Sequence, residues 1–343
     1  PRLAVLAPAR RGRDLLPRDL PYETHGYRGR LFVPGPRAAR AIVTAARASG
    51  TARVLFGTPW PQILTAPRHR RAGLRYASIV HGAELRVPAA LPGVRRRLLS
   101  ALAGAALLLP VSLFTAQRVR DLLEPAGLRV PPLAVLRARV DLARFHPGAG
   151  RAAARARLGI AEETPVVLCL GRMVPRKGLD RLVAALPDID ARAPGVALVL
   201  AGTGPEEKAL RRAAARVPQR VVFAGRVPDD EAPAVYAAAD VFALPVADRW
   251  RGLDTEGLGV VLLEASATEV PCVTGRSGGT PEAVVDGVTG FVVDARDRGR
   301  LVGAIATLLE DRELARRMAR AGRRHVRDEF GGRIPEALTQ WLE

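Results

Sequence analysis

The residues best suited to chemistry are two glutamates eight positions apart, Glu256 and Glu264. Gly257 and Gly259 follow the first, and the apolar run from Val260 to Leu263 predicts a helix that carries the second. A separation of just over two turns would place both carboxylates on one side of that helix. The helix start can hold an anion such as a diphosphate, and a nearby carboxylate can accept hydrogen bonds from sugar hydroxyls. The alternative is a surface helix with two solvated glutamates.

A basic pair, Arg172 and Lys177, is the second chemical signal. It follows an apolar run at 166–170, which predicts a buried parallel strand, and it precedes a helical pattern that starts at Leu179. Ligands bind at such strand-to-helix loops in open α/β sheets. Only Lys177 and Lys208 are lysines among the 53 basic residues, so a lysine in this loop indicates a specific use. An ammonium beside a guanidinium can neutralise a diphosphate without a metal. An exposed basic loop is the alternative.

Composition limits the class of protein. A length of 343 residues predicts two domains, and a net charge of +19 predicts an anionic partner. Aromatic residues make up only 4% of the chain, which indicates that no nucleic-acid module is present. No apolar run is long enough for a membrane span, and no signal peptide is visible, so we expect a cytoplasmic protein. Cys169 and Cys272 lie in apolar runs without metal-ligand spacing, and no metal site is predicted.

One basic segment, 91–102, is typical of an amphipathic helix at a lipid interface. Its three arginines precede three leucines: Arg95, Arg96, Arg97, Leu98, Leu99 and Leu102. We therefore expect these arginines to contact an anionic membrane or a membrane-bound acceptor. The alternative is that the arginine-rich composition simply decorates the surface.

The elements that position these residues alternate between strand and helix, which predicts doubly wound parallel sheets. Predicted strands lie at 3–6, 54–56, 76–80, 106–109, 166–170, 196–201, 220–224, 241–245, 271–274 and 291–293. Helical patterns in the second half lie at 206–215, 230–238, 260–267 and 281–285. We expect an N-terminal acceptor-binding domain at 1–138 and a nucleotide-sugar-binding domain at 139–325. A C-terminal helix within 326–343 would cross back to the first domain.

The motifs resemble those of the retaining glycosyltransferases of family four, which have two Rossmann-like domains facing across a cleft, the GT-B fold. The resemblance rests on Gly-Arg-x-x-x-x-Lys-Gly at 171–178, Gly-Thr-Gly-Pro at 202–205, the spaced glutamates and His-Gly-Ala-Glu at 81–84. The stretches 251–259, 263–268 and 277–282 are most similar to actinobacterial GDP-mannose-dependent phosphatidylinositol mannosyltransferases.

The resemblance implies roles for particular residues. Arg172 and Lys177 would hold the donor diphosphate, and Glu264 would bind the nucleotide ribose. Glu256 would contact the donor sugar, and His81 would face that sugar from the first domain. The remaining predicted donor-binding residues are Gly202, Val227, Gly257, Leu258 and Gly259. By spacing alone, His81 is better interpreted as a strand-end histidine satisfied by the backbone.

The resemblance also implies the chemistry. The anomeric configuration would be retained by a front-face displacement in which a donor phosphate oxygen accepts the proton of the acceptor hydroxyl. Neither a protein nucleophile, a cofactor nor a metal is then expected.

Three departures from the family bear on the acceptor. Residues 3–8 are similar to the second strand of the family, so we expect its first strand and glycine-rich loop to be absent from this sequence. Ala83 replaces a histidine that mannosyltransferases often have, and Arg139 replaces the usual glycine before Val140-Asp141.

Three functions remain open from the sequence. The first is a retaining transferase moving mannose from GDP-mannose onto a lipid-linked acceptor such as a phosphatidylinositol mannoside, peripheral on the inner face of the plasma membrane. The second is a soluble relative that moves another nucleotide sugar onto a small molecule. The third is a non-catalytic anion-binding or nucleic-acid-binding α/β protein, against which the intact motifs argue. The oligomeric state is not predicted.

Overall fold

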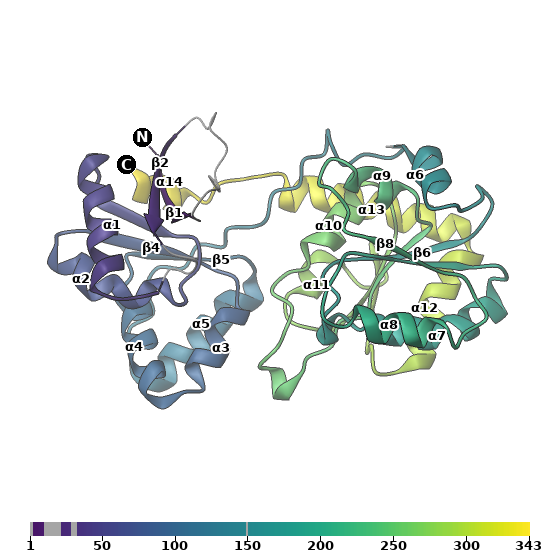
Figure 1. Cartoon of the computed structure of the whole chain (residues 1–343), viewed down its shortest axis with the longest axis horizontal. Coiled ribbons are helices and arrows are strands. Elements are labelled where there is room, and N and C mark those ends of the chain that lie inside the picture. Colours follow the sequence, from purple (N-terminus) through teal and green to yellow (C-terminus); the bar gives the residue numbers. More distant parts are fainter. Residues whose placement is uncertain (1–2, 10–21, 29–32, 149) are drawn as a thin grey trace. The chain divides into compact units, whose positions relative to one another are not determined.

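The computed structural model describes residues 3–9, 22–28, 33–148 and 150–343 (Figure 1). It divides into two compact α/β units. Unit 1 comprises Pro1–Leu136 and Ile334–Glu343, and unit 2 comprises Arg137–Arg333. The sequence predicts the domain boundary between residues 138 and 139 and the return of the chain within 326–343. The α/β class with parallel sheets is confirmed.

Unit 2 is built on a six-stranded parallel sheet with the order β11-β10-β9-β6-β7-β8. The strands are β6 (Val166–Leu170), β7 (Ala197–Ala201), β8 (Val221–Gly225), β9 (Val241–Leu244), β10 (Cys272–Gly275) and β11 (Gly290–Val293). Strands β7, β9 and β10 are buried along their whole length, as expected for a sheet covered on both faces. The strand order reverses at β6, which lies between β7 and β9. Ligands bind beside the carboxyl ends of the strands at such a reversal.

Helices cover both faces of this sheet. Figure 1 shows α7, α8 and α12 on one face and α9, α10 and α13 on the other. Their bounds, with α6 and α11, are α6 (Arg151–Arg157), α7 (Leu179–Arg192), α8 (Glu207–Ala214), α9 (Ala232–Ala237), α10 (Val260–Ala267), α11 (Thr280–Ala283), α12 (Arg298–Glu310) and α13 (Arg312–Phe330). Helix α7 packs against α12, and α10 packs against α13.

The described residues of unit 1 form two separate parallel sheets. One has the order β3-β4-β5, with β3 (Arg53–Phe56), β4 (Arg75–Val80) and β5 (Leu107–Pro110). The other pairs β1 (Ala4–Ala9) with β2 (Glu23–Arg28), a strand that the sequence did not predict. Helices α1 (Pro36–Ala48), α2 (Ala66–Arg71), α3 (Ala83–Ala89), α4 (Pro92–Ala103), α5 (Leu113–Leu123) and α14 (Glu336–Leu342) complete the unit. Leu338 and Trp341 of α14 join the apolar cluster formed by Ala77, Leu107 and Leu109.

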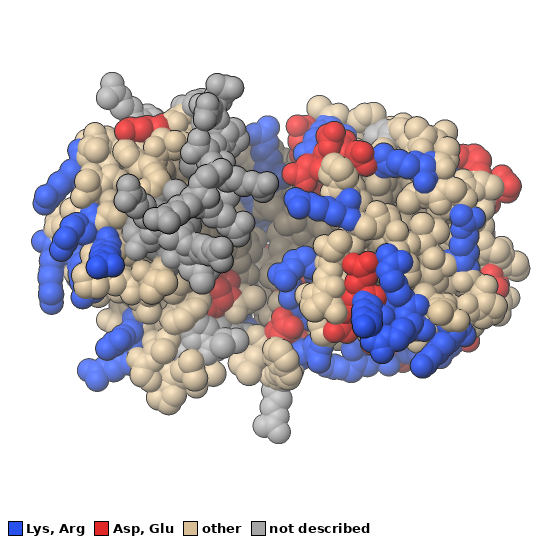
Figure 2. All heavy atoms as spheres, in the orientation of Figure 1, with Lys and Arg blue, Asp and Glu red and all other residues tan. Residues whose placement is uncertain are grey.

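Helix α4 directs its leucines inward. Leu98, Leu99 and Leu102 are buried in the core of unit 1, whereas the three arginines before them are exposed. The predicted lipid-facing apolar side of this helix is therefore wrong, because its leucines fill the protein core. Figure 2 shows basic side chains spread over both units. No helix in the described ranges is long and apolar enough to cross a membrane.

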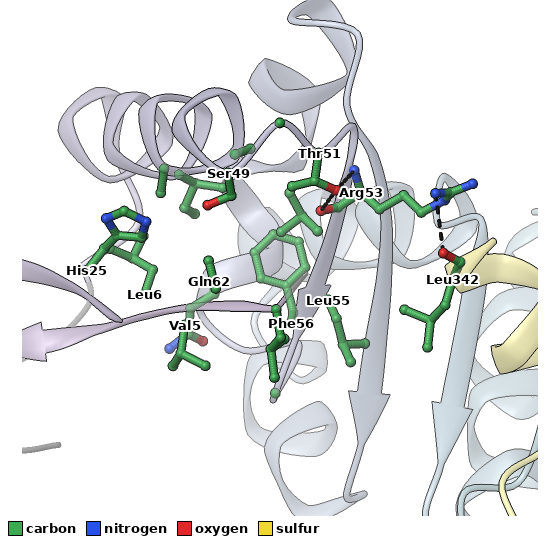
Figure 3. Close-up of a pocket in the computed structure, with 18 of the residues that line it drawn as sticks. Val5, Leu6, His25, Ser49, Thr51, Arg53, Leu55, Phe56, Gln62 and Leu342 are labelled. Atoms are coloured by element: carbon green, nitrogen blue, oxygen red, sulfur yellow. Dashed lines mark hydrogen bonds between the residues drawn. The ribbon is translucent and has the colours of Figure 1, made fainter. Parts of the chain in front are cut away.

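A cavity of about 820 Å³ separates the two sheets of unit 1 (Figure 3). Consecutive residues of β1 and β3, such as Val5-Leu6 and Leu55-Phe56, line it. Side chains alternate between the two faces of a strand, so consecutive lining residues show that strand edges face the cavity. From the usual strand rise and spacings, one strand residue fills about 160 Å³, so the cavity has the volume of about five such residues. The two sheets are thus not joined by a continuous ladder. Helix α1 contacts β1 and β2 of one sheet, and its Ala38 and Ile42 share an apolar cluster with Phe56 of the other.

Candidate functional site

The loop after β6 carries both predicted phosphate-binding residues. Arg172 is exposed near its start, and Lys177 is buried at its end, in a single 3₁₀ turn at Pro175–Lys177. Backbone hydrogen bonds join this loop to the loop after β7, with Met173 N–H donating to Thr203 O at 3.0 Å. A Cβ on Gly202 would lie only 2.0 Å from Gly171 O, so only glycine permits this approach. Gly202 therefore acts here by fixing the path of the loop.

Lys177 forms an enclosed ion pair with Glu256. Its Nζ lies 2.8 Å from Glu256 Oε2, and the two side chains are only 9% and 12% exposed. Arg176 Nε also lies 3.4 Å from Glu256 Oε2, and its Nη1 lies 3.4 Å from Asp254 Oδ1. Two cations and two carboxylates thus meet where the loops after β6 and β9 come together.

The backbone around Glu256 is held by the loop after β10. Glu256 N–H donates to Ser277 Oγ at 3.2 Å, and Gly279 N–H donates to Glu256 O at 3.0 Å. A Cβ on Gly278, whose φ is +57°, would lie 1.7 Å from Glu256 O. Ser277 Oγ in turn donates to Asp248 Oδ1. Glu256 is thereby fixed at both its main chain and its carboxylate.

Helix α10 begins after Glu256. Its N-cap is Gly259, which has a left-handed conformation with φ 85° and ψ 60°. This conformation separates the helix from the preceding residues, so Glu256 and Glu264 do not share a helical face. The sequence prediction of one shared face was wrong for this reason. Within the described residues, the N–H groups of Leu258 and Gly259 have no hydrogen-bond acceptor. These donors at the positive end of α10 suit an anion.

Glu264 lies on α10 and has a different partner. Tyr236 of α9 donates its hydroxyl to Glu264 Oε2 at 2.6 Å. Burial raises the pKa of Glu264, although the Tyr236 hydrogen bond and the Arg144 charge act in the opposite direction. Burial, followed by the negative charge of Glu264, raises the pKa of Tyr236 well above its ordinary value. The Tyr236 ring packs between Phe145 and Phe242, which holds the hydroxyl in place.

Three other predicted site residues are Gly257, Val227 and His81, and the first adjoins the ion-pair cluster. Gly257 adjoins Glu256, whereas Val227 follows β8 and is half-buried against the core of unit 2. His81 belongs to unit 1, directly after β4. Its Nε2 lies 2.9 Å from Gly57 O, and its backbone N–H donates to Glu84 Oε1 at 2.7 Å. These bonds match the interpretation of His81 as a strand-end histidine satisfied by the backbone.

Sequence reasoning missed three residues of this site. Arg176 and Asp254 join the ion-pair cluster, and each lies within two residues of a predicted site residue, which is a usable signal. Tyr236 gave no signal, because it lies 28 positions before Glu264 and on a different helix.

The fold and the site of unit 2 together define a class of protein. In unit 2, the reversal of strand order brings together a basic loop, two carboxylates and a helix N-terminus with free donors. Such a site at the carboxyl edge of a parallel sheet is that of a nucleotide-binding α/β enzyme.

The chain belongs to the glycosyl transferases group 1 family, whose sequence pattern matches residues 150–325. It is 41% identical to the GDP-mannose-dependent alpha-(1-6)-phosphatidylinositol monomannoside mannosyltransferase of Mycobacterium tuberculosis, over 94% of this chain and 84% of the relative. The protein of the same description from Mycolicibacterium smegmatis is 40% identical over 90% of this chain and 82% of its own length. The resemblance inferred from the sequence motifs is therefore confirmed, and the protein is a glycosyltransferase.

Solved structures support the fold. The Anabaena protein HepE in complex with UDP superposes with a TM-score of 0.75, covering 94% of this chain and 85% of HepE. The two sequences are 22% identical, so this likeness concerns the fold alone. The chain has the GT-B fold.

Proposed function

We propose that this protein transfers mannose from GDP-mannose onto a phosphatidylinositol mannoside with retention of the anomeric configuration. The observation that carries the proposal is the 41% identity, along 94% of the chain, to a mannosyltransferase described as acting with this donor on this class of acceptor. The ion-pair cluster and the start of α10 support the proposal, because cations and backbone N–H groups suit a diphosphate and a carboxylate suits sugar hydroxyls.

Charge at the donor site supports a role in binding the diphosphate. Arg172 extends into solvent, and Lys177 is held at the inner end of the same loop. Arg176 adds a third cation whose carboxylate contacts are longer, at 3.4 Å. In our proposal these cations and the N–H groups of Leu258 and Gly259 provide the countercharge, so that GDP binds without a metal.

The two glutamates take separate roles in this proposal. Glu264, oriented by Tyr236, accepts hydrogen bonds from the ribose hydroxyls. Glu256, fixed by Lys177 and the loop after β10, binds hydroxyls of the donor sugar. The bond between mannose and the donor phosphate then breaks, and GDP leaves. A phosphate oxygen of the departing GDP accepts the proton of the acceptor hydroxyl, whose oxygen forms the new glycosidic bond on the same face of the sugar, and His81 contacts the donor sugar. A side-chain nucleophile is not required in this scheme.

We further propose that catalysis takes place at the anionic surface of the membrane that holds the acceptor, on its cytoplasmic side. The exposed arginines of α4, Arg95, Arg96 and Arg97, provide the attraction in this proposal.

An activity assay tests the proposed reaction. The purified chain is incubated with phosphatidylinositol monomannoside and, in separate reactions, GDP-mannose, UDP-glucose or ADP-glucose. We expect a dimannosylated lipid from GDP-mannose alone, with an α-anomeric linkage by NMR. Preferential turnover of UDP-glucose, or transfer only to water-soluble acceptors, would support the small-molecule alternative instead.

A further inference from the structure

Helix α13 presents a gently winding row of arginines on its outer face. Arg312, Arg316, Arg320 and Arg324 recur every four residues, and all are exposed. Residues four apart share one side of a helix, so this row extends over about 18 Å. The opposite side of α13 is buried in unit 2 through Met318, Ala319, Gly322, Val326 and Phe330. The outer face is therefore fixed by the packing of the inner one.

The four arginines form no close ion pair with the residues that the structure describes. Within the ranges that the structure describes, none of them has a carboxylate within 4 Å. Neighbouring helices differ in this respect: Arg157 of α6 lies 2.9 Å from Glu231, and Arg298 of α12 lies 2.7 Å from Asp188.

Like charges four residues apart destabilise a helix. Asp328 lies one turn beyond Arg324 on α13, and its pKa is lowered by its hydrogen bond with Arg327 and by the charge of Arg324. The charge at this end of the row is therefore partly compensated. The arginines still repel one another, and an external anionic surface would relieve that repulsion.

The geometry of this row suits a flat partner better than α4 does. Three consecutive residues, such as Arg95, Arg96 and Arg97, point about 100° apart around a helix, so they cannot all face one plane. The four arginines of α13 turn by only about 40° from each to the next and spread over about 120°, so their long side chains can reach one plane. The exposed face of α13 has no aromatic side chain, since Phe330 is buried, so it lacks the stacking groups of single-strand nucleic-acid sites.

We infer that the outer face of α13 docks on the anionic headgroup layer of a phospholipid bilayer. This inference rests on the proposed lipid acceptor for its choice of partner, and on charge complementarity for its location. The apolar residues of α13 are committed to the core, so docking is electrostatic and the helix stays at headgroup level.

Docking through α13 would act on the donor-binding unit itself. Helix α13 packs directly on α10, where a Cβ on Gly322 would lie 3.2 Å from the Cβ of Ser266. Arg323 donates to Phe145 O at 2.8 Å and also to Ala267 O at the end of α10. The helix that meets the membrane is thus joined to the helix that carries Glu264. The arginine row would fix the orientation of the donor site relative to the bilayer.

Vesicle co-sedimentation tests the inference. Arg312, Arg316, Arg320 and Arg324 are changed together to Gln in the full chain. The matched control changes four arginines of unit 2 that have carboxylate partners, Arg157, Arg192, Arg298 and Arg300, to Gln. Both variants lose the same net charge, so a general charge effect would weaken them equally. The vesicles are phosphatidylcholine alone or with 30% phosphatidylglycerol, with a short DNA duplex as the competing anion.

The expected outcome is a difference between the two variants. Each arginine near a charged surface contributes about fivefold to binding, so the α13 variant should bind anionic vesicles at least ~50-fold more weakly. The control should change less than ~3-fold, and neither protein should bind neutral vesicles. Equal losses in both variants, or unchanged binding of the α13 variant, would overturn the inference. Tighter binding of the wild type to DNA than to anionic vesicles would also overturn it.

Two further measurements separate possible failures. The thermal unfolding temperature of the α13 variant should not fall, because the change removes repulsion. If it does fall, the pair Arg316→Gln and Arg320→Gln replaces the fourfold change, with at least ~10-fold weaker binding expected. Transfer of mannose to a water-soluble acceptor reports on the proposed function and should be unchanged. Loss of vesicle binding with intact transfer therefore supports the docking surface independently of the catalytic assignment.

Discussion

Lys177 is enclosed beside Glu256 at 2.8 Å, with Arg176 as a second neighbour of the same carboxylate. Removing one member of a buried pair leaves an uncompensated charge, which costs more than the attraction itself. Lys177 therefore has both a structural partner and, in our proposal, a ligand.

Replacing Lys177 with Ala should weaken GDP binding by ~1.5–3 kcal/mol, because a charge-assisted hydrogen bond is lost. Calorimetry in EDTA measures this affinity, and we expect the wild type to bind GDP under those conditions. Lys208→Ala is the matched control, because Lys208 is the other lysine of the chain and is exposed on α8. Dependence on magnesium, or unchanged affinity in Lys177→Ala, would contradict the prediction.

Glu256→Gln and Glu264→Gln should have different effects. Glu264→Gln should weaken GDP binding, since a ribose contact loses its charge, whereas Glu256→Gln should mainly lower kcat. GDP calorimetry and steady-state kinetics measure the two effects. The opposite division between affinity and turnover would refute the assignment.

The same Glu264 variant should change the dependence of stability on pH. The folded-state pKa of Glu264 is raised by burial, so the folded protein binds this proton more tightly than the unfolded chain does. This contribution to stability is present below the unfolded pKa and is lost as the pH rises through the folded one. Glu264→Gln should remove the loss of stability that accompanies ionisation of Glu264. Unfolding temperatures measured from pH 4 to 8 should show that, at neutral pH, the variant is at least as stable as the wild type. A variant that is less stable only at neutral pH would show that the ionised carboxylate is stabilising.

At the scale of elements, the site depends on how loops meet at the carboxyl edge of the sheet in unit 2. Strand β6 lies between β7 and β9, and the strand order reverses there. The loops that follow these three strands therefore border one crevice outside the carboxyl ends of the strands. Gly202 and Gly278 permit the close backbone contacts that the loops then make. These contacts hold the ion-pair cluster before a ligand arrives.

We expect the strands of unit 1 to have a lower local stability than those of unit 2. The edges of β1 and β3 that face the cavity have no strand partner in the described residues, and buried Ser49 Oγ, Gln62 Oε1 and Trp341 Nε1 have no hydrogen-bond partner there. Unpaired buried polar groups cost free energy, and local opening follows from low local stability.

Hydrogen exchange should detect this difference. We expect the amides of β1 and β3 to exchange at least ~100-fold faster than those of β6 and β7, which are paired on both sides. Mass spectrometry of peptides from each strand measures the rates. Equal protection in both units would show that the cavity edges are paired in solution.

At the scale of the molecule, a net charge of +19 acts on every anionic surface the protein meets. A test of the α4 arginines must therefore distinguish an effect of where they lie from the effect of lowering the net charge of the protein.

Changing Arg95, Arg96 and Arg97 to Gln should lower binding to anionic vesicles, and this effect should shrink as salt rises, because the Debye length is only about 8 Å at physiological salt. The control is the same change at Arg37, Arg40 and Arg47, which are exposed on α1. Activity toward a water-soluble acceptor should be unaffected. Equal recovery with anionic and neutral vesicles would leave α4 without a role in docking.

The sequence by itself determined the features that depend on local patterns. Short continuous apolar runs located the strands of unit 2. Helix α10 spans 260–267, as the sequence pattern predicted. The basic loop at 171–178 and the motif at 202–205 indicated the family, because each motif keeps its residues within a few positions of one another. Fold class, enzyme class and family follow from such short-range signals.

Only the tertiary structure decided which side chains meet. The left-handed conformation of Gly259 places Glu256 outside α10, where it forms an ion pair with Lys177. Tyr236, on a different helix, donates a hydrogen bond to Glu264. The pattern of arginines and leucines around Arg97 is that of an amphipathic helix. The leucines are nevertheless buried in the core of unit 1 and are not available to contact lipid. These outcomes depend on contacts between residues far apart in the chain, and a linear pattern of hydrophobicity and charge does not specify such contacts.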